Sequence, residues 1–399
     1  MLTDIDKEKA PALSTLSGVL AHSCEEYPTF LELSRKLDSL YGTTLTGSSG
    51  KRGENQIVIL SASGINDSYS LDGESVYEEM AKLLCSVLFK PNVKDGAFSE
   101  EDFLQEQRQS LDAIDGLFND KRAWAKKRLF EEMCGNEKYG INVLGTKEQV
   151  KALTAKKLYE QYKELLKTAR LEIICLCAND TENVKKIFTE QFSSVERAVD
   201  LGATEIVTKA DKVREVKDTL DVNQSKLMLG FRTGCAEPDD GAEAVKLMTA
   251  VLGGTAHSKL FNNVREKQSL CYYCASGFDP LKGIMTVESG VEKKNIEKTK
   301  NAVLKEIEDM KNGIISDEEI ENTKRSLTNS YMTSVDSSAG TLSWYLSQIL
   351  KGRDRTPREQ ADVISKITKE EIVEAAKKLS LDTVYVLTSN GETETEEEE

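Results

Sequence analysis

The feature that most constrains the fold is an internal repeat, because the same order of predicted elements occurs twice within 399 residues. In each half, a β-rich segment is followed by a helix and then by a second helix that begins at a capping serine. A third helix and a β-branched strand close each half. The β-rich segments lie at 55–64 and 283–292, and the capping serines are Ser99 and Ser316. A threonine opens each closing helix at nearly the same separation as the two serines, which favours duplication over chance.

The repeat predicts an α+β protein of two homologous domains. Each domain is expected to hold an antiparallel-rich mixed sheet with helices on one face, because each half mixes hairpins with strands joined through helices. We expect the domains at 1–205 and 212–390, a polar linker within 193–219, and a solvated acidic tail at 391–399. The second half opens with a strand at 225–234 for which the first half has no counterpart. The first domain is therefore expected to lack its opening strand or strands.

Charge and composition exclude several classes of function. The formal net charge of -15 disfavours nucleic-acid binding, which needs a basic surface to displace counterions. No apolar run reaches the roughly 20 residues that span a bilayer, and the first residues lack the apolar core of a signal peptide. The eight cysteines of a long, charged chain are typical of free thiols in a reducing compartment. We therefore expect a cytoplasmic protein with no membrane partner.

Three stretches carry a resemblance to a known family. They are EEYPTFLELSRKLDSLYG at 25–42, KPNVKDGAFSEEDFLQEQ at 90–107 and LFEEMCGNEKYGI at 129–141. Through these stretches and its paired layout, the chain resembles the pitrilysin/insulinase family of inverzincin metallopeptidases over nearly its whole length. It is most similar to a non-catalytic bacterial subgroup whose name links it to modification of elongation factor P. The resemblance implies paired domains of the fold shared by LuxS and the mitochondrial processing peptidase.

The stretch GVLAHSCEEYPTF at 18–30 raises the question of a zinc helix, because His22 and the two following glutamates approximate H-x-x-E-H. In active relatives, a tyrosine–proline stretch follows the second histidine by about two helical turns. Here the equivalent stretch is EEYP at 25–28, and counting back from it places the motif at Ser14, Ser17 and Gly18. His22 is then interpreted as a polar residue at a helix C-terminus, where it suits the helix dipole.

The third family ligand is a glutamate seven residues after another glutamate on a helix. Glu106 matches the first glutamate, but Ala113 occupies the ligand position, and Asp112 lies about 100° around the helix. The chain has only two histidines, His22 and His257, whereas a catalytic zinc typically takes three protein ligands. We therefore predict no metal and no other cofactor, and we expect no intrinsic zinc proteolysis.

A second part of the family site is retained in LFNNVREKQSLCYYCASG at 260–277. In the family, an arginine and a tyrosine seven residues apart bind the substrate backbone and help to stabilise the oxyanion, and Arg265 and Tyr272 match them. The alternatives are a surface salt bridge for Arg265 and a core-packed strand aromatic for Tyr272.

The remaining small motifs are interpreted as structural. Cys271 and Cys274 lie three apart on a predicted strand, so their side chains should point to opposite faces. The alternating Cys175 and Cys177 should be buried on one strand face. The glycines at 47, 50 and 53 are interpreted as turns, since no phosphate-loop spacing accompanies them.

Three functions remain open at this point. The first is a non-catalytic subunit that pairs with a zinc-bearing paralogue, completes a peptidase chamber and binds peptide or unfolded protein. The second is a structural or assembly protein with no proteolytic role. The third, an independent zinc endopeptidase, is disfavoured by the missing ligands.

Overall fold

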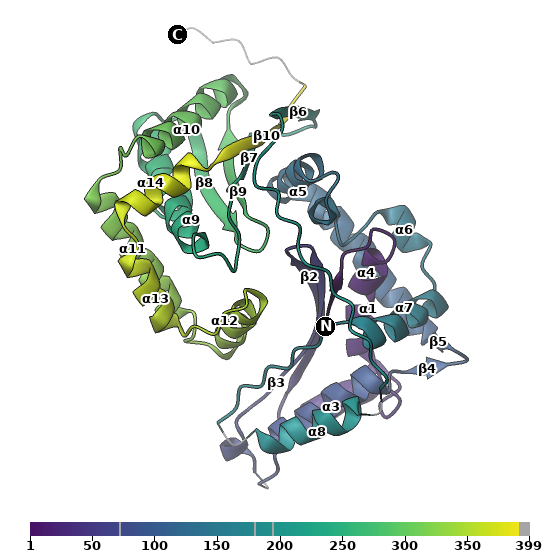
Figure 1. The fold of residues 1–399 in the computed structure, drawn as a ribbon. Helices are drawn as coiled ribbons and strands as arrows, with labels where there is room; N and C mark the ends of the chain where they lie inside the picture. Colours follow the sequence, from purple (N-terminus) through teal and green to yellow (C-terminus); the bar gives the residue numbers. More distant parts are fainter. Residues whose placement is uncertain (72, 179–180, 194, 391–399) are drawn as a thin grey trace, which may run out of the picture. The chain divides into compact units, whose positions relative to one another are not determined.

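The chain divides into two compact units. The computed structural model describes residues 1–399 except 72, 179–180, 194 and 391–399, so the acidic tail lies outside the described residues. Unit 1 comprises Met1–Gly116 and Ile141–Ala203, and unit 2 comprises Leu117–Gly140 and Thr204–Glu399 (Figure 1). The segment Leu117–Gly140 falls inside the range expected for the first domain, yet its contacts belong to unit 2.

Unit 1 alternates helices with short strands. Its elements are β1 (Leu2–Asp4), α1 (Ala10–His22), α2 (Phe30–Ser39), β2 (Thr44–Arg52), β3 (Asn55–Ser63), η1 (Asp67–Tyr69), α3 (Val76–Phe89), β4 (Val93–Lys94), β5 (Ala97–Phe98), α4 (Glu100–Asn119, whose last turn enters unit 2), α6 (Lys147–Lys151), α7 (Ala155–Thr168) and α8 (Glu182–Phe192).

The main sheet of unit 1 has the strand order β1-β3-β2 among the described residues, and both pairings are antiparallel. β2 and β3 form a hairpin through Gly53, whose positive φ of 56° suits a two-residue turn. Gly47 and Gly50 lie inside β2, so their interpretation as turns was wrong. A Cβ on Gly47 would lie 1.7 Å from the carbonyl oxygen of Ser17. Glycine is needed there because α1 and β2 approach each other at backbone distance.

Residues 171–177, expected to form the closing strand of the first half, belong to no strand ladder of the described chain. A strand needs a hydrogen-bonded neighbour, and the isolated bridge from Leu2 of β1 is to Arg170, the residue just before this segment. Cys175 is therefore exposed and Cys177 half-buried, contrary to the expected burial.

Unit 2 is larger and has a complete sheet. Its elements are α5 (Lys121–Met133), η2 (Lys138–Gly140), β6 (Arg214–Thr219), β7 (Ser225–Arg232), α9 (Ala242–Thr249), η3 (Ala250–Gly254), η4 (Leu260–Lys267), β8 (Cys271–Asp279), β9 (Ile284–Val291), η5 (Lys293–Asn295), α10 (Ile296–Lys311), α11 (Asp317–Thr333), α12 (Ser338–Leu350), α13 (Pro357–Lys366), α14 (Lys369–Lys377) and β10 (Ser380–Thr388).

The sheet of unit 2 has the order β6-β10-β7-β9-β8 within the described part of the chain. Only the β10–β6 pair is parallel, so the sheet is mixed and antiparallel-rich, and the predicted α+β class is confirmed. β6 occupies residues that the sequence assigned to a linker. The predicted capping box of Ser316 with Glu319 is present at the start of α11.

The central strand β7 is buried on both faces. Leu227, Leu229 and Phe231 pack into the main core beneath α9 and α14, whereas Met228 packs against α5 on the opposite face. α5 is an addition to the expected single helical layer, and it comes from the segment that interrupts unit 1 in sequence. No helix in the described residues combines the length and the apolar character that crossing a membrane requires.

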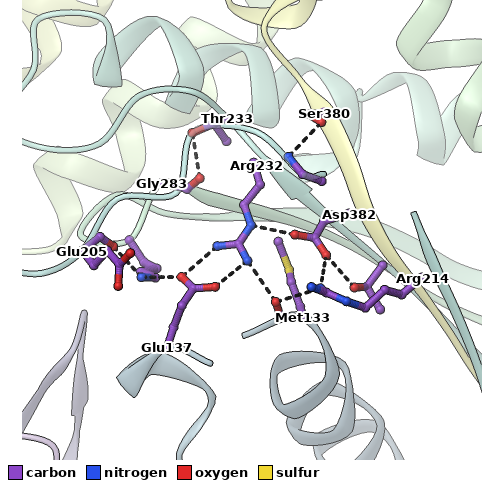
Figure 2. A network of polar contacts seen from close by, with 12 residues as sticks. Met133, Glu137, Glu205, Arg214, Arg232, Thr233, Gly283, Ser380 and Asp382 are labelled. Atoms are coloured by element: carbon purple, nitrogen blue, oxygen red, sulfur yellow. Dashed lines mark hydrogen bonds and ion pairs between the residues drawn. The ribbon is translucent and has the colours of Figure 1, made fainter. Parts of the chain in front are cut away.

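A buried ionic network attaches the α5 segment to the sheet (Figure 2). Arg232 on β7 is 2% exposed and donates two hydrogen bonds to Glu137, at 2.6 and 3.0 Å. The same guanidinium reaches Asp382 on β10 at 2.8 Å and the carbonyl oxygen of Met133 at 2.9 Å. Lys282, which is fully buried, contacts Glu137 at 2.6 Å. One carboxylate from the segment Leu117–Gly140 therefore contacts two buried cations, one on β7 and one in the turn between β8 and β9.

The protonation state of Glu137 follows from this arrangement. Burial would raise the pKa of its carboxyl, but the hydrogen bonds from Arg232 and Lys282 outweigh burial and hold the pKa below its ordinary value. Its contribution to stability is present above an unfolded pKa of 4.5 and is lost as the pH falls through the lower folded pKa.

Removing the carboxylate of Glu137 should destabilise the fold. We predict that Glu137→Ala lowers the free energy of unfolding by about 3–5 kcal/mol, because it leaves two buried cations short of a partner. Urea unfolding followed by circular dichroism measures the change. Glu190→Ala is the matched control, since the Lys186–Glu190 pair at 3.8 Å is 74% and 64% exposed on its two sides. That control should change stability by less than about 0.5 kcal/mol. Equal losses in the two variants would contradict the structural role of the network.

Candidate functional site

The positions matched to the zinc motif lie on α1, which runs antiparallel to α4. Three contacts fix this register. The Ser23 hydroxyl donates to Asp102, Gly18 lies against Glu106, and Thr15 and Ser110 are hydrogen-bonded at 2.9 Å. As residue numbers fall along α1, they rise along α4.

Glu106 occupies the space beside Gly18. A Cβ on Gly18 would lie 1.8 Å from Oε2 of Glu106, so the carboxylate fills the volume that a larger residue would need. The other oxygen, Oε1, lies 3.4 Å from Nδ1 of His22 and accepts a hydrogen bond from Gln109 at 3.0 Å. Burial raises the pKa of Glu106 above its ordinary value, while His22 lowers it and Asp102 raises it further.

His22 is the last residue of α1, as expected for a helix C-terminus, but it is buried. Its ring stacks on Phe30 with centroids 4.9 Å apart. Ser23, the next residue, is extended, so Glu25 and Glu26 lie beyond the helix. The apparent H-x-x-E-E motif therefore has no common helical face, and the interpretation of His22 as a zinc-helix mimic is excluded by geometry.

The four positions assigned to the lost zinc site differ in their surroundings. The Ser14 hydroxyl donates to the carbonyl oxygen of Val143 at 2.8 Å, and the Ser17 hydroxyl donates to the Ser14 carbonyl at 2.9 Å. Gly18 follows on the same helix, whereas Ala113 is exposed on α4, three residues beyond Ser110. Across the described residues, no group of three His, Cys, Asp or Glu side chains could hold a metal ion. Ser14, Ser17 and Gly18 therefore take part in helix packing.

Sequence reasoning missed the contact of Glu106 with Gly18 and His22. The seven-residue spacing of the family placed the expected ligand at Ala113 rather than at Glu106. The sequence carries no local signal that shows which turn of α4 faces Gly18. Sequence reasoning also missed the position of β2, the edge strand beside this part of α1. An edge strand offers backbone groups to which an extended peptide can add.

Arg265 and Tyr272 lie in unit 2. Arg265 is in the last turn of η4, a π-helical segment, and its guanidinium stacks over Phe261 at 4.7 Å. Its nearest ionic partner is Glu266 at 3.5 Å, and its side chain is 40% exposed. Tyr272 is on β8, the edge strand of the sheet, and is 58% exposed. Its hydroxyl reaches Glu292 only at 3.5 Å. Both groups keep donors available to solvent, and Tyr272 is not packed on a core face.

The neighbouring side chain shows why Tyr272 points outward. Tyr273 is half-buried under the guanidinium of Arg122, which lies 4.6 Å from the ring centroid. Arg122 in turn binds both oxygens of Glu288, at 2.6 and 3.2 Å. This clamp holds Tyr273 in place and leaves the adjacent Tyr272 as the accessible phenol.

Comparisons with known proteins agree on one family. The family described as "Peptidase M16 inactive domain" matches residues 152–327. "Probable inactive metalloprotease YmfF" of Bacillus subtilis (strain 168) is 32% identical over 388 residues, which cover 97% of this chain and 91% of that protein. "Uncharacterized zinc protease YmxG" of the same organism is 26% identical over 251 residues, which cover 61% of this chain and 60% of the relative.

Solved structures share the fold across nearly the whole chain. A conserved protein from Enterococcus faecalis V583 superposes with a TM-score of 0.91 at 28% identity, covering 98% of this chain and 93% of that one. A peptidase M16 inactive domain from Pseudomonas fluorescens gives a TM-score of 0.77 at 17% identity, covering 99% and 93%. The second similarity concerns the fold alone.

The contact between Gly18 and Glu106 yields a test of packing. We predict that Gly18→Ala destabilises the protein by about 1–3 kcal/mol, because the added methyl must displace a buried carboxylate. Adding Glu106→Ala in the same chain should recover most of this loss. Gly116→Ala on α4 is the control, since its Cβ would meet nothing within 4 Å. That change should stabilise by roughly 0.4–1 kcal/mol. A neutral Gly18→Ala in urea unfolding would contradict the contact.

The raised pKa of Glu106 predicts a pH dependence with a defined sign. The stability that this carboxyl contributes is complete below its unfolded pKa of 4.5 and is lost as the pH rises through the higher folded pKa. Glu106→Gln, which keeps the shape and removes the charge, should raise the thermal midpoint at neutral pH relative to the parent. The gain should shrink as the pH approaches 4.5. A gain in thermal midpoint that grows as the pH falls would contradict the raised pKa of Glu106.

Proposed function

The chain belongs to the M16 peptidase family, the pitrilysin/insulinase family of its sequence resemblance, and we propose that within it this protein is a non-catalytic peptide-binding subunit. In this proposal it pairs with a zinc-bearing paralogue. The paralogue supplies the metal and the general base, and this chain supplies Arg265 and Tyr272. The substrate is a peptide or an unfolded protein segment.

The proposal rests on the contrast between the matched ligand positions on α1 and the exposed donors of unit 2. On α1, the positions matched to the metal ligands are Ser14, Ser17 and Gly18, and the space beside Gly18 is filled by Glu106. In unit 2, Arg265 and Tyr272 keep exposed hydrogen-bond donors whose contacts with neighbouring carboxylates are long. A chain that has lost the metal chemistry and kept the substrate-binding donors is suited to assist another chain's active site.

The donors suit a peptide carbonyl. A guanidinium offers a fork of N–H groups and a phenol offers one O–H, and both can stabilise negative charge on a carbonyl oxygen. Tyr272 lies on the edge strand β8, where an extended peptide can add by backbone hydrogen bonds. Arg265 lies in a π-helical turn, a geometry that is frequent at functional sites.

Zinc proteases related to this chain exist, and YmxG is named as one. We propose a partner of that kind in a heterodimer within the cytoplasm. The link to elongation factor P that the resemblance implies stays a prediction.

A structural or assembly role is the second candidate. It is favoured by the contact of Arg265 with its neighbour Glu266, which is also what an ordinary surface arginine would show. Under that role, both Arg265 and Tyr272 are dispensable for any activity of a partner. An independent zinc endopeptidase is not proposed, and stoichiometric zinc in the purified chain would contradict our view of α1.

The experiment is kinetic reconstitution. The chain is mixed with a zinc-bearing M16 paralogue from the same genome, and kcat/KM is measured on a fluorogenic peptide. We predict that Arg265→Ala lowers kcat/KM of the pair by about 10²-fold or more, the typical cost of one lost oxyanion donor. Tyr272→Phe keeps the ring, removes the hydroxyl and should cause a smaller loss.

Matched controls separate binding from folding. Arg325 is exposed on α11 and Tyr69 is 74% exposed on η1, so Arg325→Ala and Tyr69→Phe should leave kcat/KM unchanged. Thermal melting should be unchanged in all four variants. If mixing gives no gain in cleavage, or if all four variants behave alike, the proposal is wrong and the assembly role is favoured.

A further inference from the structure

The start of β8 contains a register shift that brings two cysteines onto one face. Cys271 pairs with Val291 and Tyr273 pairs with Gly290, so Tyr272 is the extra residue of a β-bulge. Cys274 then pairs with Ser289. Because Val291 and Ser289 are two residues apart on β9, they share a face, and their partners Cys271 and Cys274 share it too. The expectation that these cysteines point to opposite faces was wrong, since it assumed a regular strand.

Burial and contact agree with this register. Cys274 belongs to the main core of unit 2, and Cys271 packs against the same core while remaining half-buried. Each thiol influences the pKa of the other, and both lie near Ser289, whose hydroxyl donates to the carbonyl oxygen of Tyr273 at 2.8 Å. Their partners Val291 and Ser289, two positions apart, are separated by about 6.6 Å along β9. The Cα atoms of the two cysteines opposite them therefore lie near the upper end of the roughly 4.4–6.8 Å that disulfides usually show.

The surroundings give the two thiols opposite pKa shifts. The hydrogen bond from Cys274 outweighs burial and, together with Ser289 and the charge of Arg265, lowers the pKa of Cys271 to about 7. The same pairing, with burial, raises the pKa of Cys274 well above its ordinary value. Other charges near the pair are Glu288 on β9, which acts on Cys274, and Arg265 on η4. A thiolate-rich, half-exposed cysteine beside a buried second thiol is the arrangement of a redox-active pair.

We propose that Cys271 and Cys274 form a dithiol site that is oxidised reversibly to an intrastrand disulfide by small-molecule disulfides of the glutathione class. This site is independent of the proposed peptide-binding function. It is also independent of any metal.

The exchange balances in two steps. The Cys271 thiolate attacks one sulfur of the oxidant, forms a mixed disulfide and releases one thiolate of the small molecule. Cys274 gives its proton to solvent and attacks the Cys271 sulfur, and the second small-molecule thiolate leaves. The protein loses two hydrogens, and the oxidant becomes two thiols once the released thiolates take up protons. Dithiothreitol reverses both steps.

The chain contains a matched control pair. Cys175 and Cys177 are also neighbouring thiols, but burial and Cys177 raise the pKa of Cys175 to about 11, although the residue is exposed. Near neutral pH its thiolate is scarce. Allowing for the lower intrinsic nucleophilicity of the more acidic thiol, Cys271 should react about 10²-fold faster than Cys175.

The experiment treats the full reduced chain with glutathione disulfide near pH 7 and follows tryptic peptides by mass spectrometry. Both site cysteines lie in residues 268–282, and the control pair lies in residues 171–185. We expect the first peptide to lose two hydrogens and the second to lag by about 10²-fold. Cys274→Ser should accumulate a glutathione adduct on Cys271, because the resolving thiol is gone. Cys271→Ser should form neither product.

Two further measurements keep the test decisive. Alkylation of Cys271 by iodoacetamide should reach half of its maximal rate near pH 7, and Arg265→Ala should move this midpoint upward. Thermal melting confirms that the serine variants fold. Equal reaction of the two peptides, or a stable glutathione adduct on the parent chain without closure to a disulfide, would overturn the proposal.

Discussion

The buried pairing of Arg232 with Glu137 is the interaction on which the arrangement of unit 2 depends. β7 is the central strand, and its neighbours bury it on both faces, so a charged residue at its end needs a full set of partners. Those partners are Glu137 and the carbonyl of Met133 from the α5 segment and Asp382 from β10. The network therefore couples a segment from the first half of the chain to the sheet of the second. It explains why Leu117–Gly140 packs with unit 2 although its sequence neighbours on both sides belong to unit 1.

In unit 1, packing contacts occupy the positions that the sequence resemblance matches to metal ligands. A zinc site needs ligands with free lone pairs directed at one point. Here the two serine hydroxyls donate to backbone carbonyls and the glycine leaves a space that Glu106 fills. The carboxylate is partly compensated by His22 and Gln109. α1 and α4 are thus held together by side-chain packing and hydrogen bonds.

The bulge at the start of β8 underlies both proposed sites of unit 2. It turns Tyr272 outward, where its phenol is accessible, and turns Cys271 and Cys274 inward onto one face. Arg265 enters both proposals, since its donors are exposed and its charge lowers the pKa of Cys271. One extra residue in an edge strand accounts for the positions of all three side chains.

The sequence alone determined what depends on local chemistry and on residue identity. The repeat indicated two α+β halves, the serine at 316 with its glutamate marked a helix start that the structure contains, and the scarcity of histidine excluded a three-ligand zinc site of the family type. Only the tertiary structure decided which turn of α4 faces Gly18, that α5 packs on β7, and that residues 171–177 form no ladder in the described chain. It also decided that two cysteines three apart share a face. The first three features rest on contacts between residues that are distant in sequence. The last rests on a one-residue shift of strand register, which moves every later side chain to the other face and leaves no local signature in the sequence.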